Sequence, residues 1–364
     1  RPEAVMLTLR TGLVGCGKVG QTHALALGRL PESEFVAVCD SAASRADAFG
    51  KRHAVQSFTD VEEMLRECNL QALMICTPHP EHESACVTAA KFGVHVLIEK
   101  PMAATLDSCD RMLEAADRFG TQIGVVSQRR LFEPIQRMKH AIDQGKIGSP
   151  ILGTFSMFSY RDKAYYESDS WRGQWASEGG GVLVNQSPHM LDILQWLMGE
   201  VDEVHGYWAN FTHPYIEVED TSVATVRFKS GGLGNIVTSL CQKPGIDTKI
   251  HVHGSNGGSI GVQTDTGATF VAGMSGIEHP PFTDLWTIPG EQDRLAEFQQ
   301  QDRDVFNQVD ATTHYHCLQI KDFLQAILTG QTPMVTGDAG RMVVAMFTAI
   351  YRSQKLGQPI RFPL

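Results

Sequence analysis

The sequence has no long apolar run and no surplus of positive charge. No stretch approaches the ~20 consecutive apolar residues that a helix needs to cross a bilayer. Lysine and arginine number 31 against 41 acidic residues, which gives a formal net charge of −10. Nucleic acids and anionic membranes are bound by positively charged surfaces. We therefore expect neither a nucleic acid nor a membrane as a partner.

The eight cysteines lack the spacing of a metal or redox motif. No Cys-x-x-Cys pair occurs, and several cysteines lie inside apolar runs such as residues 72–76. We expect reduced, buried thiols and therefore a reducing, cytoplasmic location. Internal repeats and low-complexity tracts are also absent from the sequence.

The composition is that of an ordinary globular protein, with 42% hydrophobic and 20% charged residues. A length of 364 residues, set against ~150 per domain, predicts two domains. We place them at 1–127 and 128–364, with a C-terminal helix at about 339–355 that packs back near the first domain.

The first domain alternates short apolar runs with stretches of helical periodicity, which is typical of a doubly wound parallel sheet. The second domain has longer alternating strands joined by Gly-rich turns, which predict a large open, mostly antiparallel sheet with added helices. The predicted fold class is thus α/β, a Rossmann domain followed by an α+β domain. The predicted strands are 7–14, 35–39, 72–76, 94–98, 122–126, 151–160, 201–211, 221–228, 233–240 and 249–254, and residues 261–310 are expected to form an irregular surface excursion.

A Gly-x-Gly-x-x-Gly motif follows the first predicted strand and opens a helix. Its glycines are Gly15, Gly17 and Gly20, which suit a tight turn, close approach to a pyrophosphate and close helix packing. Asp40 ends the second strand, where its carboxylate can accept hydrogen bonds from ribose hydroxyls. We therefore favour NAD over NADP, although Arg45 lies close enough to reach a 2′-phosphate. The structural alternative is a Gly-rich turn in a domain that binds no nucleotide.

Two further motifs carry polar groups at positions where ligands bind. Thr77-Pro78-His79-Pro80-Glu81-His82 follows one strand and Glu99-Lys100-Pro101 follows another. Lys100 thus lies at the carboxyl end of a parallel strand, the edge at which ligands bind in such sheets.

A third motif runs from Trp171-Arg172-Gly173 through Gly179-Gly180-Gly181 to Asn185, His189 and Asp192. Helical spacing would put Asn185, His189 and Asp192 on one face. A histidine suits proton transfer near neutral pH, and a carboxylate at i+3 can orient it. The alternative for His189 is a core or capping histidine, and for Asp192 a solvent-facing carboxylate.

Together these motifs resemble the glucose–fructose oxidoreductase/inositol dehydrogenase/rhizopine catabolism family, Gfo/Idh/MocA. The resemblance covers nearly the whole chain and implies an NAD-dependent oxidoreductase that acts on a secondary hydroxyl of a sugar, glycoside or cyclic polyol, with glucoside C3 oxidation as one form. It also implies a homodimer or homotetramer that associates through the open sheet. Two positions depart from the family pattern, since His79 replaces the usual Asn and Asn185 replaces the common Asp.

The resemblance assigns site residues to three groups. Lys100, His189 and Asp192 are the expected catalytic residues, and Asn185, Tyr160, Trp171, Arg172 and His314 are expected to bind substrate. Arg129, Arg130, Tyr165 and Tyr166 are further candidates for the substrate cleft. The expected cofactor contacts are Gly15, Gly17, Lys18, Val19, Gly20, Asp40, Arg45, Thr77, Pro78, His79, His82, Glu99, Lys100 and Gln128.

Several alternatives stay open. Within the class they are inositol dehydrogenation and a glycoside-cleaving enzyme that uses bound NAD for a transient oxidation. Outside it, a non-catalytic sugar sensor would keep the same fold. The pairs His251-x-His253 and His314-x-His316 have metal-ligand spacing but lack nearby cysteines or clustered carboxylates, so no metal is expected.

Overall fold

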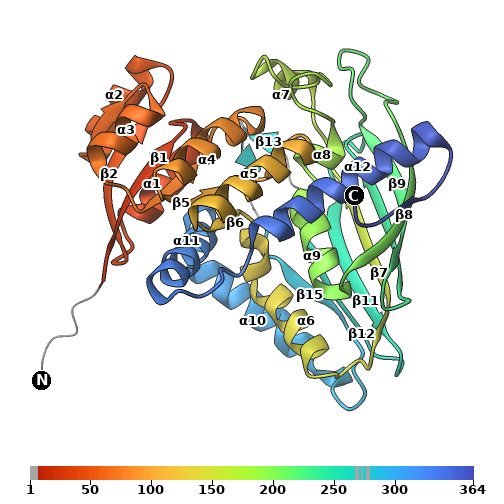
Figure 1. Cartoon of the computed structure of the whole chain (residues 1–364). Coiled ribbons are helices and arrows are strands. Elements are labelled where there is room, and N and C mark those ends of the chain that lie inside the picture. The colour runs from red at the N-terminus through yellow and green to blue at the C-terminus, as the bar shows by residue number, and fades with distance from the viewer. Residues whose placement is uncertain (1–6, 267–269, 272–273, 276–278) are drawn as a thin grey trace, which may run out of the picture. The chain divides into compact units, whose positions relative to one another are not determined.

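The computed structural model describes residues 7–266, 270–271, 274–275 and 279–364. These residues form two compact units (Figure 1). The first unit contains the described part of Arg1–Gln128 together with Thr312–Met342, and the second contains Arg129–Ala311 and Val343–Leu364. The structure thus adds to the first unit a segment, 312–342, that the sequence places in the second domain.

The first unit is built on a six-stranded sheet with the order β3-β2-β1-β4-β5-β6. All five strand pairs are parallel. The four residues of β4 are all buried, as expected for a strand covered on both faces. The strands are β1 (Leu9–Val14), β2 (Ser33–Cys39), β3 (Gln56–Phe58), β4 (Ala72–Ile75), β5 (His95–Ile98) and β6 (Ile123–Val125).

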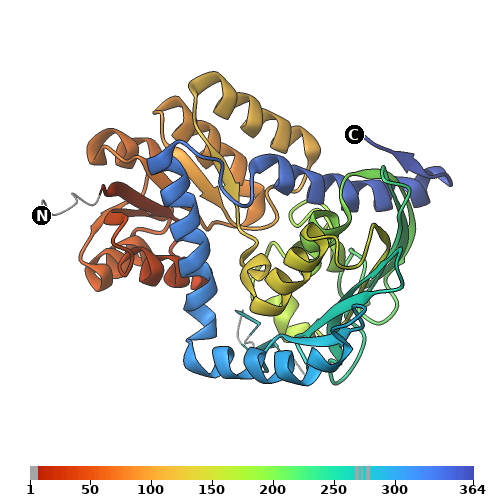
Figure 2. The same cartoon turned by 90° about the horizontal axis from the view of Figure 1, so that it is seen from below.

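Helices cover both faces of this sheet (Figure 1). One face is covered by α1 (Lys18–Leu27), α2 (Ala43–His53) and α11 (Ala311–Thr329), whose apolar side chains share one buried cluster with those of the strands. Figure 2 shows α11 running beside the strands and helices of the first unit. Its residues Ile320, Phe323 and Leu324 belong to the buried apolar cluster. This apolar face is the physical reason that α11 belongs to the first unit. The other face carries α3 (Val61–Cys68), α4 (His82–Lys91, after the short helix η1, His79–Glu81) and α5 (Leu106–Phe119).

The second unit contains an eight-stranded sheet with the order β15-β12-β11-β7-β10-β9-β8-β16. Only the β7–β10 pair is parallel among its described pairs. The predicted fold class, a doubly wound parallel sheet plus a mostly antiparallel one, is confirmed. The strands are β7 (Pro150–Phe158), β8 (Val201–Ala209), β9 (Thr221–Phe228), β10 (Leu233–Ser239), β11 (Asp247–Gly254), β12 (Ser259–Thr264), β15 (Phe282–Trp286) and β16 (Ile360–Arg361), and β13 (Phe270–Val271) pairs separately with β14 (Met274–Ser275).

Helices pack on one face of this sheet, and the strands alternate buried and exposed residues toward the other. In β9, for example, Ser222, Ala224 and Val226 are buried while the residues between them are more exposed. The helices are η2 (Gln128–Leu131, which begins in the first unit), α6 (Glu133–Asp143), α7 (Lys163–Glu167), α8 (Val182–Asn185), α9 (Pro188–Met198), η3 (Gln292–Arg294) and α10 (Leu295–Gln308), and α12 (Gly337–Leu356) begins in the first unit and ends in the second.

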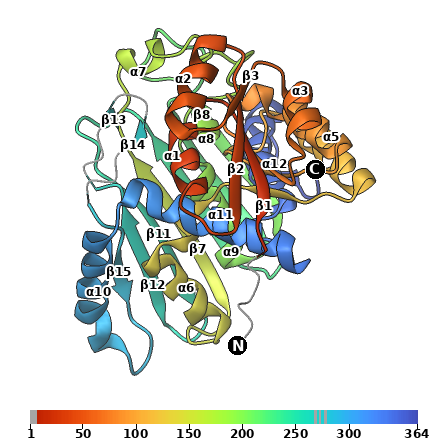
Figure 3. The same ribbon diagram turned by 90° about the vertical axis from the view of Figure 1, so that its left-hand side faces the viewer.

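The predicted irregular excursion over residues 261–310 is wrong for most of the described part of that segment. β12 and β15 extend the sheet, and α10 lies beside β15 (Figure 3). Asp302 of α10 is buried and accepts hydrogen bonds from the backbone and hydroxyl of Thr283 on β15, at 2.8 and 3.0 Å. The polar helix α10 thus packs against β15 partly through a buried carboxylate. A contact of this kind leaves no apolar periodicity in the sequence, so the pattern does not predict it. Among the described residues, no helix is long and apolar enough to cross a membrane.

Candidate active site

The Gly-rich loop between β1 and α1 requires glycine at two positions and leaves space at the third. Gly15 has φ +95°, and a Cβ there would lie 2.6 Å from the carbonyl carbon of Cys76. A Cβ on Gly20 would lie 2.1 Å from the oxygen of Gly15, so Gly20 permits the helix to pack closely. Gly17 has no atom within 4 Å of its Cβ position. A phosphate can therefore approach the backbone at Gly17, where α1 begins.

Asp40 connects this loop to the end of β2. Its side chain is buried, Oδ2 accepts the backbone N–H of Cys16 at 2.9 Å, and Oδ1 accepts that of Ala42 at 2.9 Å. Arg45, whose side chain is half exposed, lies 2.9 Å from the same Oδ1. The carboxylate is therefore held at the position predicted for a ribose contact, and Arg45 is engaged by it.

The turn after β4 contains a hydroxyl that suits a ligand. Thr77 Oγ1 is buried and has no hydrogen-bond partner among the described residues. His79, which follows Pro78, is buried as well. His82 contacts two backbone carbonyls, that of Met102 through Nδ1 at 3.1 Å and that of Thr77 through Nε2 at 3.0 Å. Burial lowers the pKa of His82. The structure therefore gives His82 a role in fixing the turn, beside its predicted cofactor contact.

The remaining predicted residues of the first unit are distributed around the same edge of the sheet or on α11. Lys100 follows β5 directly, and its backbone N–H donates to Glu99 Oε2 at 3.1 Å. Gln128 Oε1 is buried without a hydrogen-bond partner in the described part of the chain. Lys18 and Val19 begin α1, and His314 lies half-buried on α11.

These residues fit a bound dinucleotide. Two buried oxygens, on Thr77 and Gln128, are without protein partners, Gly17 offers an open backbone, and Asp40 offers a fixed carboxylate. Buried polar atoms are normally hydrogen-bonded, so unsatisfied ones indicate a place for ligand or water.

In the second unit, a buried carboxylate holds the Gly-Gly-Gly run. A Cβ on Gly180 would lie 2.2 Å from the Tyr351 hydroxyl, and a Cβ on Gly181 would lie 1.9 Å from the Glu219 carbonyl oxygen. Glu219 is fully buried and accepts the N–H groups of Gly181 and Leu183 at 2.8 and 3.0 Å, and the Tyr351 hydroxyl at 2.8 Å. The start of α8 is therefore fixed against strand β9 and helix α12.

Asn185, the last residue of α8, pairs with a second buried carboxylate. Its Nδ2 donates to Glu178 Oε1 at 2.5 Å, and Glu178 Oε2 accepts the N–H of Gly173 at 2.6 Å. Glu178 is 1% exposed. A buried acid therefore lies next to position 185 and accepts a hydrogen bond from the amide there.

His189 and Asp192 both lie on α9, which begins at Pro188, so Asn185 does not share one continuous helix with them. His189 is 9% exposed. The Asp192 carboxylate is buried and is bound by both ends of the Arg130 guanidinium, at 2.7 and 2.6 Å. Arg130 also stacks 4.7 Å from the centroid of the Trp196 ring. Arg130 is thus the ion-pair partner of Asp192. The orientation of His189 by Asp192 stays a prediction.

Aromatic residues surround Arg172 before the Gly-Gly-Gly run. Its guanidinium lies 4.5 Å from the Trp171 ring centroid and 4.4 Å from that of Tyr165, and it donates to the Tyr165 hydroxyl at 2.6 Å. Tyr165 and Tyr166 are buried, so they pack within the unit. Tyr160 is half-buried beneath Lys243, 5.3 Å from the ring centroid. Arg129 pairs with Asp265 at 2.5 Å.

Two groups of metal-ligating side chains occur in the described part of the chain, His23–Glu99–His316 and His213–Asp220–Cys241. In the second group both ring nitrogens of His213 already have partners, Asp220 Oδ2 and the Arg161 carbonyl, each at 2.8 Å. His251 and His253, singled out in the sequence, instead bond Asp284 and Ser259, each at 2.8 Å.

Comparison with known families and structures decides the relationship. The model described as "Oxidoreductase family, NAD-binding Rossmann fold" matches residues 9–127, and the "GFO/IDH/MocA C-terminal domain" matches residues 135–260. The chain belongs to the Gfo/Idh/MocA oxidoreductase family. Residues 9–127 form the NAD-binding domain of that family, and the predicted cofactor, NAD, is confirmed at this level.

Three Gfo/Idh/MocA relatives match nearly the full length. Myo-inositol 2-dehydrogenase of Thermotoga maritima is 26% identical over 350 residues, 95% of this chain and 96% of the relative. The NAD(+) scyllo-inositol 2-dehydrogenase of Bacillus subtilis is 25% identical over 359 residues, 97% and 96% of the two chains. The solved structure of the WlbA dehydrogenase from Bordetella pertussis, in complex with NADH and UDP-GlcNAcA, has a TM-score of 0.86 and 29% identity and covers 100% of both chains.

Three buried residues, two in the second unit and one in the first, lack a predicted role in the sequence. Glu178 and Glu219 are buried acids, and His23 is a buried histidine on α1. A signal for His23 was present, since it interrupts the apolar inner face of a helix at the predicted loop. Glu178 directly precedes the Gly-Gly-Gly run, but nothing in its spacing indicates burial.

Proposed function

We propose that this protein oxidises a secondary hydroxyl of a sugar, glycoside or cyclic polyol, with NAD as the hydride acceptor. The observation that carries the proposal is Lys100 at the carboxyl end of β5, two strands from the Gly-rich loop in the sheet order. The named dehydrogenase activities of the two inositol relatives support it. Glucoside C3 oxidation is one form of the proposal and inositol oxidation is another.

Bound NAD would supply a hydride acceptor, and the protein's own residues would manage the proton and the charge. Asp40, Thr77 and the backbone at Gly17 would hold the cofactor, together with the predicted contacts other than Glu99. His189 would take the proton of the hydroxyl group. The Lys100 ammonium would stabilise the developing alkoxide with a charge-assisted hydrogen bond. Asp192, held by Arg130, would place negative charge on the helix that carries His189.

Asn185, Tyr160, Trp171, Arg172 and His314 would contact the substrate. Asn185 can donate to and accept from a hydroxyl, and aromatic faces beside polar groups suit a sugar ring. We further propose a homodimer or homotetramer formed through the open sheet of the second unit, and a reducing, cytoplasmic location for a chain whose eight cysteines are all free thiols.

A second substrate class is supported by the WlbA comparison. The WlbA structure, similar over all of this chain, contains a UDP-linked sugar acid together with NADH. A nucleotide-linked sugar is therefore a second candidate substrate here.

One assay separates these candidates. The purified protein is incubated with NAD or NADP and a panel of glucosides, free sugars, inositols and UDP-sugars, and NADH or NADPH is followed by its absorbance. Product NMR then identifies the oxidised carbon. Glycoside cleavage without net NADH indicates transient oxidation, and binding of a sugar without turnover indicates a sensor. Either result would contradict the proposed net oxidation.

Replacing Lys100 tests the residue on which the proposal depends. Lys100→Ala removes the charge that stabilises the alkoxide, so kcat is expected to fall by about 10²–10³-fold. The Kd for NAD, measured by fluorescence titration, is expected to stay within about threefold, since the phosphates are held by the Gly-rich loop. Lys91→Ala, at an exposed position on α4, is the control. Unchanged kcat in Lys100→Ala would contradict the assignment.

A further inference from the structure

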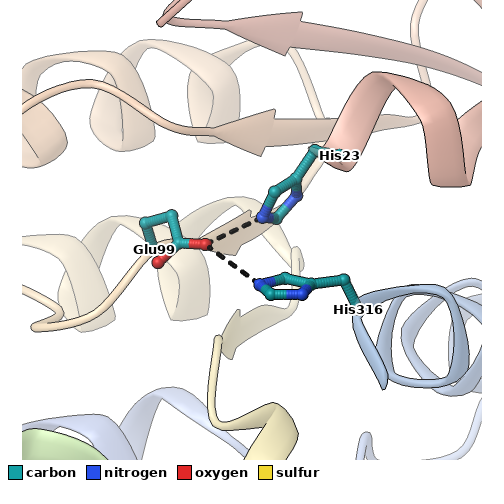
Figure 4. A group of neighbouring side chains, drawn as sticks. All are labelled: His23, Glu99 and His316. Atoms are coloured by element: carbon teal, nitrogen blue, oxygen red, sulfur yellow. Dashed lines mark hydrogen bonds and ion pairs between the residues drawn. The ribbon is translucent and has the colours of Figure 1, made fainter. Parts of the chain in front are cut away.

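Two histidines flank the carboxylate of Glu99 in the first unit (Figure 4). His23 comes from α1, His316 comes from α11, and Glu99 follows β5 directly. His23 Nε2 lies 2.8 Å from Glu99 Oε1, and His316 Nε2 lies 4.0 Å from the same oxygen. The His23 side chain is 0% exposed and that of Glu99 is 9% exposed. The family motif around Lys100 assigns no role to either histidine.

Both oxygens of Glu99 are bound by donors. Oε1 accepts from His23 Nε2, and Oε2 accepts from the backbone N–H of Lys100 at 3.1 Å. A carboxylate that is bound through both oxygens cannot rotate without losing a hydrogen bond. His23 therefore fixes Glu99, and Glu99 fixes the backbone that carries the Lys100 side chain.

The cluster holds the Glu99 carboxylate next to Lys100. Burial raises the pKa of Glu99, but the hydrogen bond from His23 and the electrostatic interactions with the two histidines and Lys100 lower it to about 2. The carboxylate is therefore ionised at neutral pH. Burial and the neighbouring His23 lower the pKa of His316 to about 4, so the His316 ring adds no positive charge there. The Lys100 backbone N–H bonds Glu99 Oε2 at 3.1 Å, so the carboxylate lies beside this residue, and its negative charge favours the protonated Lys100 amine.

Two imidazoles and a carboxylate could also hold a zinc ion. The geometry favours a hydrogen bond instead. Ligand atoms of a tetrahedral zinc lie ~3.3 Å apart when each is ~2.0 Å from the metal, whereas the Glu99 and His23 atoms are 2.8 Å apart. The second carboxylate oxygen is already used by Lys100.

We propose that Glu99 is the buried counter-ion and backbone anchor of Lys100, held in its orientation by His23, and that it is a positioning residue rather than a cofactor ligand. This assignment rests on the proposed function in one respect, namely that Lys100 acts on the substrate. His316 closes the cluster without a hydrogen bond to the carboxylate.

The test combines kinetics with a measurement that needs no turnover. Four variants are compared with the wild type: His23→Leu removes the donor, His23→Gln retains an N–H at the position of Nε2, Glu99→Gln removes the charge, and His316→Gln is the matched control. Each is assayed for kcat, KM and the Kd for NAD. In the absence of ligands, acetylation of Lys100 by an N-hydroxysuccinimide ester is timed by peptide mass spectrometry, because the reagent attacks the unprotonated amine.

His23→Leu is expected to lower kcat at least tenfold while KM and the Kd for NAD stay within threefold, and His23→Gln is expected to restore kcat to within threefold of wild type. Glu99→Gln is expected to accelerate acetylation of Lys100 at least threefold at pH 7.5, since the ammonium loses its counter-charge. His316→Gln should leave the acetylation rate within twofold. Thermal melts confirm that each variant is folded.

Three outcomes would overturn the proposal. The first is an acetylation rate in Glu99→Gln that matches the wild type. The second is an NAD affinity that falls more than tenfold in Glu99→Gln with unchanged acetylation, which would make Glu99 a cofactor ligand. The third is stoichiometric metal in the purified protein whose removal reproduces the loss of activity. If the wild type oxidises none of the panel, the proposed function is wrong, and the acetylation rates still decide whether Glu99 is the counter-ion of Lys100.

Discussion

The amide at position 185 is explained by its neighbour, the buried side chain of Glu178. The family commonly has aspartate at this position, and here the amide nitrogen donates to the buried carboxylate of Glu178 at 2.5 Å. An aspartate at 185 would place two carboxylates in contact inside the second unit. Glu178 thus places an acceptor there and requires a donor at position 185.

Asn185→Asp is expected to destabilise the protein in a pH-dependent way. Two facing carboxylates share a proton at low pH, which raises the pKa of the pair, so stability is lost as pH rises and the proton leaves. We expect a loss of about 2 kcal/mol in the free energy of unfolding at pH 8, measured by urea denaturation, and a smaller loss at pH 5.

The double variant Asn185→Asp/Glu178→Gln is the control for that experiment. It reverses donor and acceptor, since the glutamine can donate to the new aspartate and still accept from Gly173, and it should recover most of the stability. Equal stability of Asn185→Asp and wild type at pH 8 would show that Glu178 and residue 185 do not interact as described.

At the scale of residues, the position of a residue within a motif is easier to predict than the partner with which its side chain forms a hydrogen bond or ion pair. Gly15, Gly20 and Asp40 occupy the positions that their motif indicates, because the motif is local and follows a strand. The partner of Asp192 is Arg130, which lies 62 residues earlier in the sequence. No spacing rule connects such residues, since the fold alone brings them together.

At the scale of elements, the connection between β8 and β9 is held by a histidine–aspartate pair. Burial lowers the pKa of His213, but hydrogen bonds to Asp220 and to the Arg161 carbonyl raise it above its usual value. Both ring nitrogens lie 2.8 Å from oxygen atoms, Nδ1 from Asp220 Oδ2 and Nε2 from the Arg161 carbonyl, an arrangement that favours the protonated ring. Although burial raises the pKa of Asp220, the bonds from His213 and from the N–H groups of Thr212 and Phe211 hold it well below its usual range.

The pair makes stability depend on pH in a defined direction. A folded-state pKa above the unfolded value of ~6.5 means that the stabilisation from His213 is fully present below pH ~6.5 and is lost as pH rises through the folded-state value. We expect the free energy of unfolding to fall between pH 6 and pH 9 by about 1 kcal/mol for each unit by which the pKa is raised. His213→Gln should flatten this dependence, measured by urea denaturation at several pH values.

His140→Gln, at an exposed position on α6, is the control for this element. It should keep the wild-type pH dependence. A slope that is identical in His213→Gln and wild type would assign the pH dependence to other groups.

Periodicity predicts elements well when one face is apolar and poorly when polar groups make the contact. The predicted strand 221–228 matches β9 in both bounds, since its residues alternate cleanly. β12 was not predicted because Gly261 interrupts its pattern. Glycine is required at position 261 because a Cβ there would lie 2.2 Å from the His251 ring. The His251 ring on β11 passes over this position to bond Asp284 on β15.

At the scale of the whole molecule, the sequence predicts the two sheets but not the assignment of every helix. The apolar face of α11 indicates that the helix is packed, and it cannot indicate which sheet it covers. Contacts with strands more than 180 residues away decide this, as Gln319 Nε2 donating to the Val125 carbonyl of β6 illustrates.

The outward face of the eight-stranded sheet leads to a prediction about assembly. Tyr207, Val223 and Leu233 are 65%, 47% and 54% exposed. Val223 pairs directly with Tyr207 on β8 and with Val237 on β10, so Tyr207, Val223 and Val237 form a row across three strands, and Leu233 lies further along β10. Contiguous exposed apolar surface on a sheet face is typical of an interaction site, and association with a second copy is the commonest form of assembly.

Val223→Lys is expected to weaken the proposed homo-oligomer, because the interface would bring a lysine from each copy into an apolar contact. Size-exclusion chromatography with light scattering should show a wild-type dimer or tetramer and a shift of the variant toward smaller species at the same concentration. Phe92→Lys, which places the same charge at an exposed apolar position directly after α4, should leave the mass unchanged. A monomeric wild type would refute the assembly, and an oligomeric Val223→Lys with wild-type mass would move the interface away from this face of the sheet.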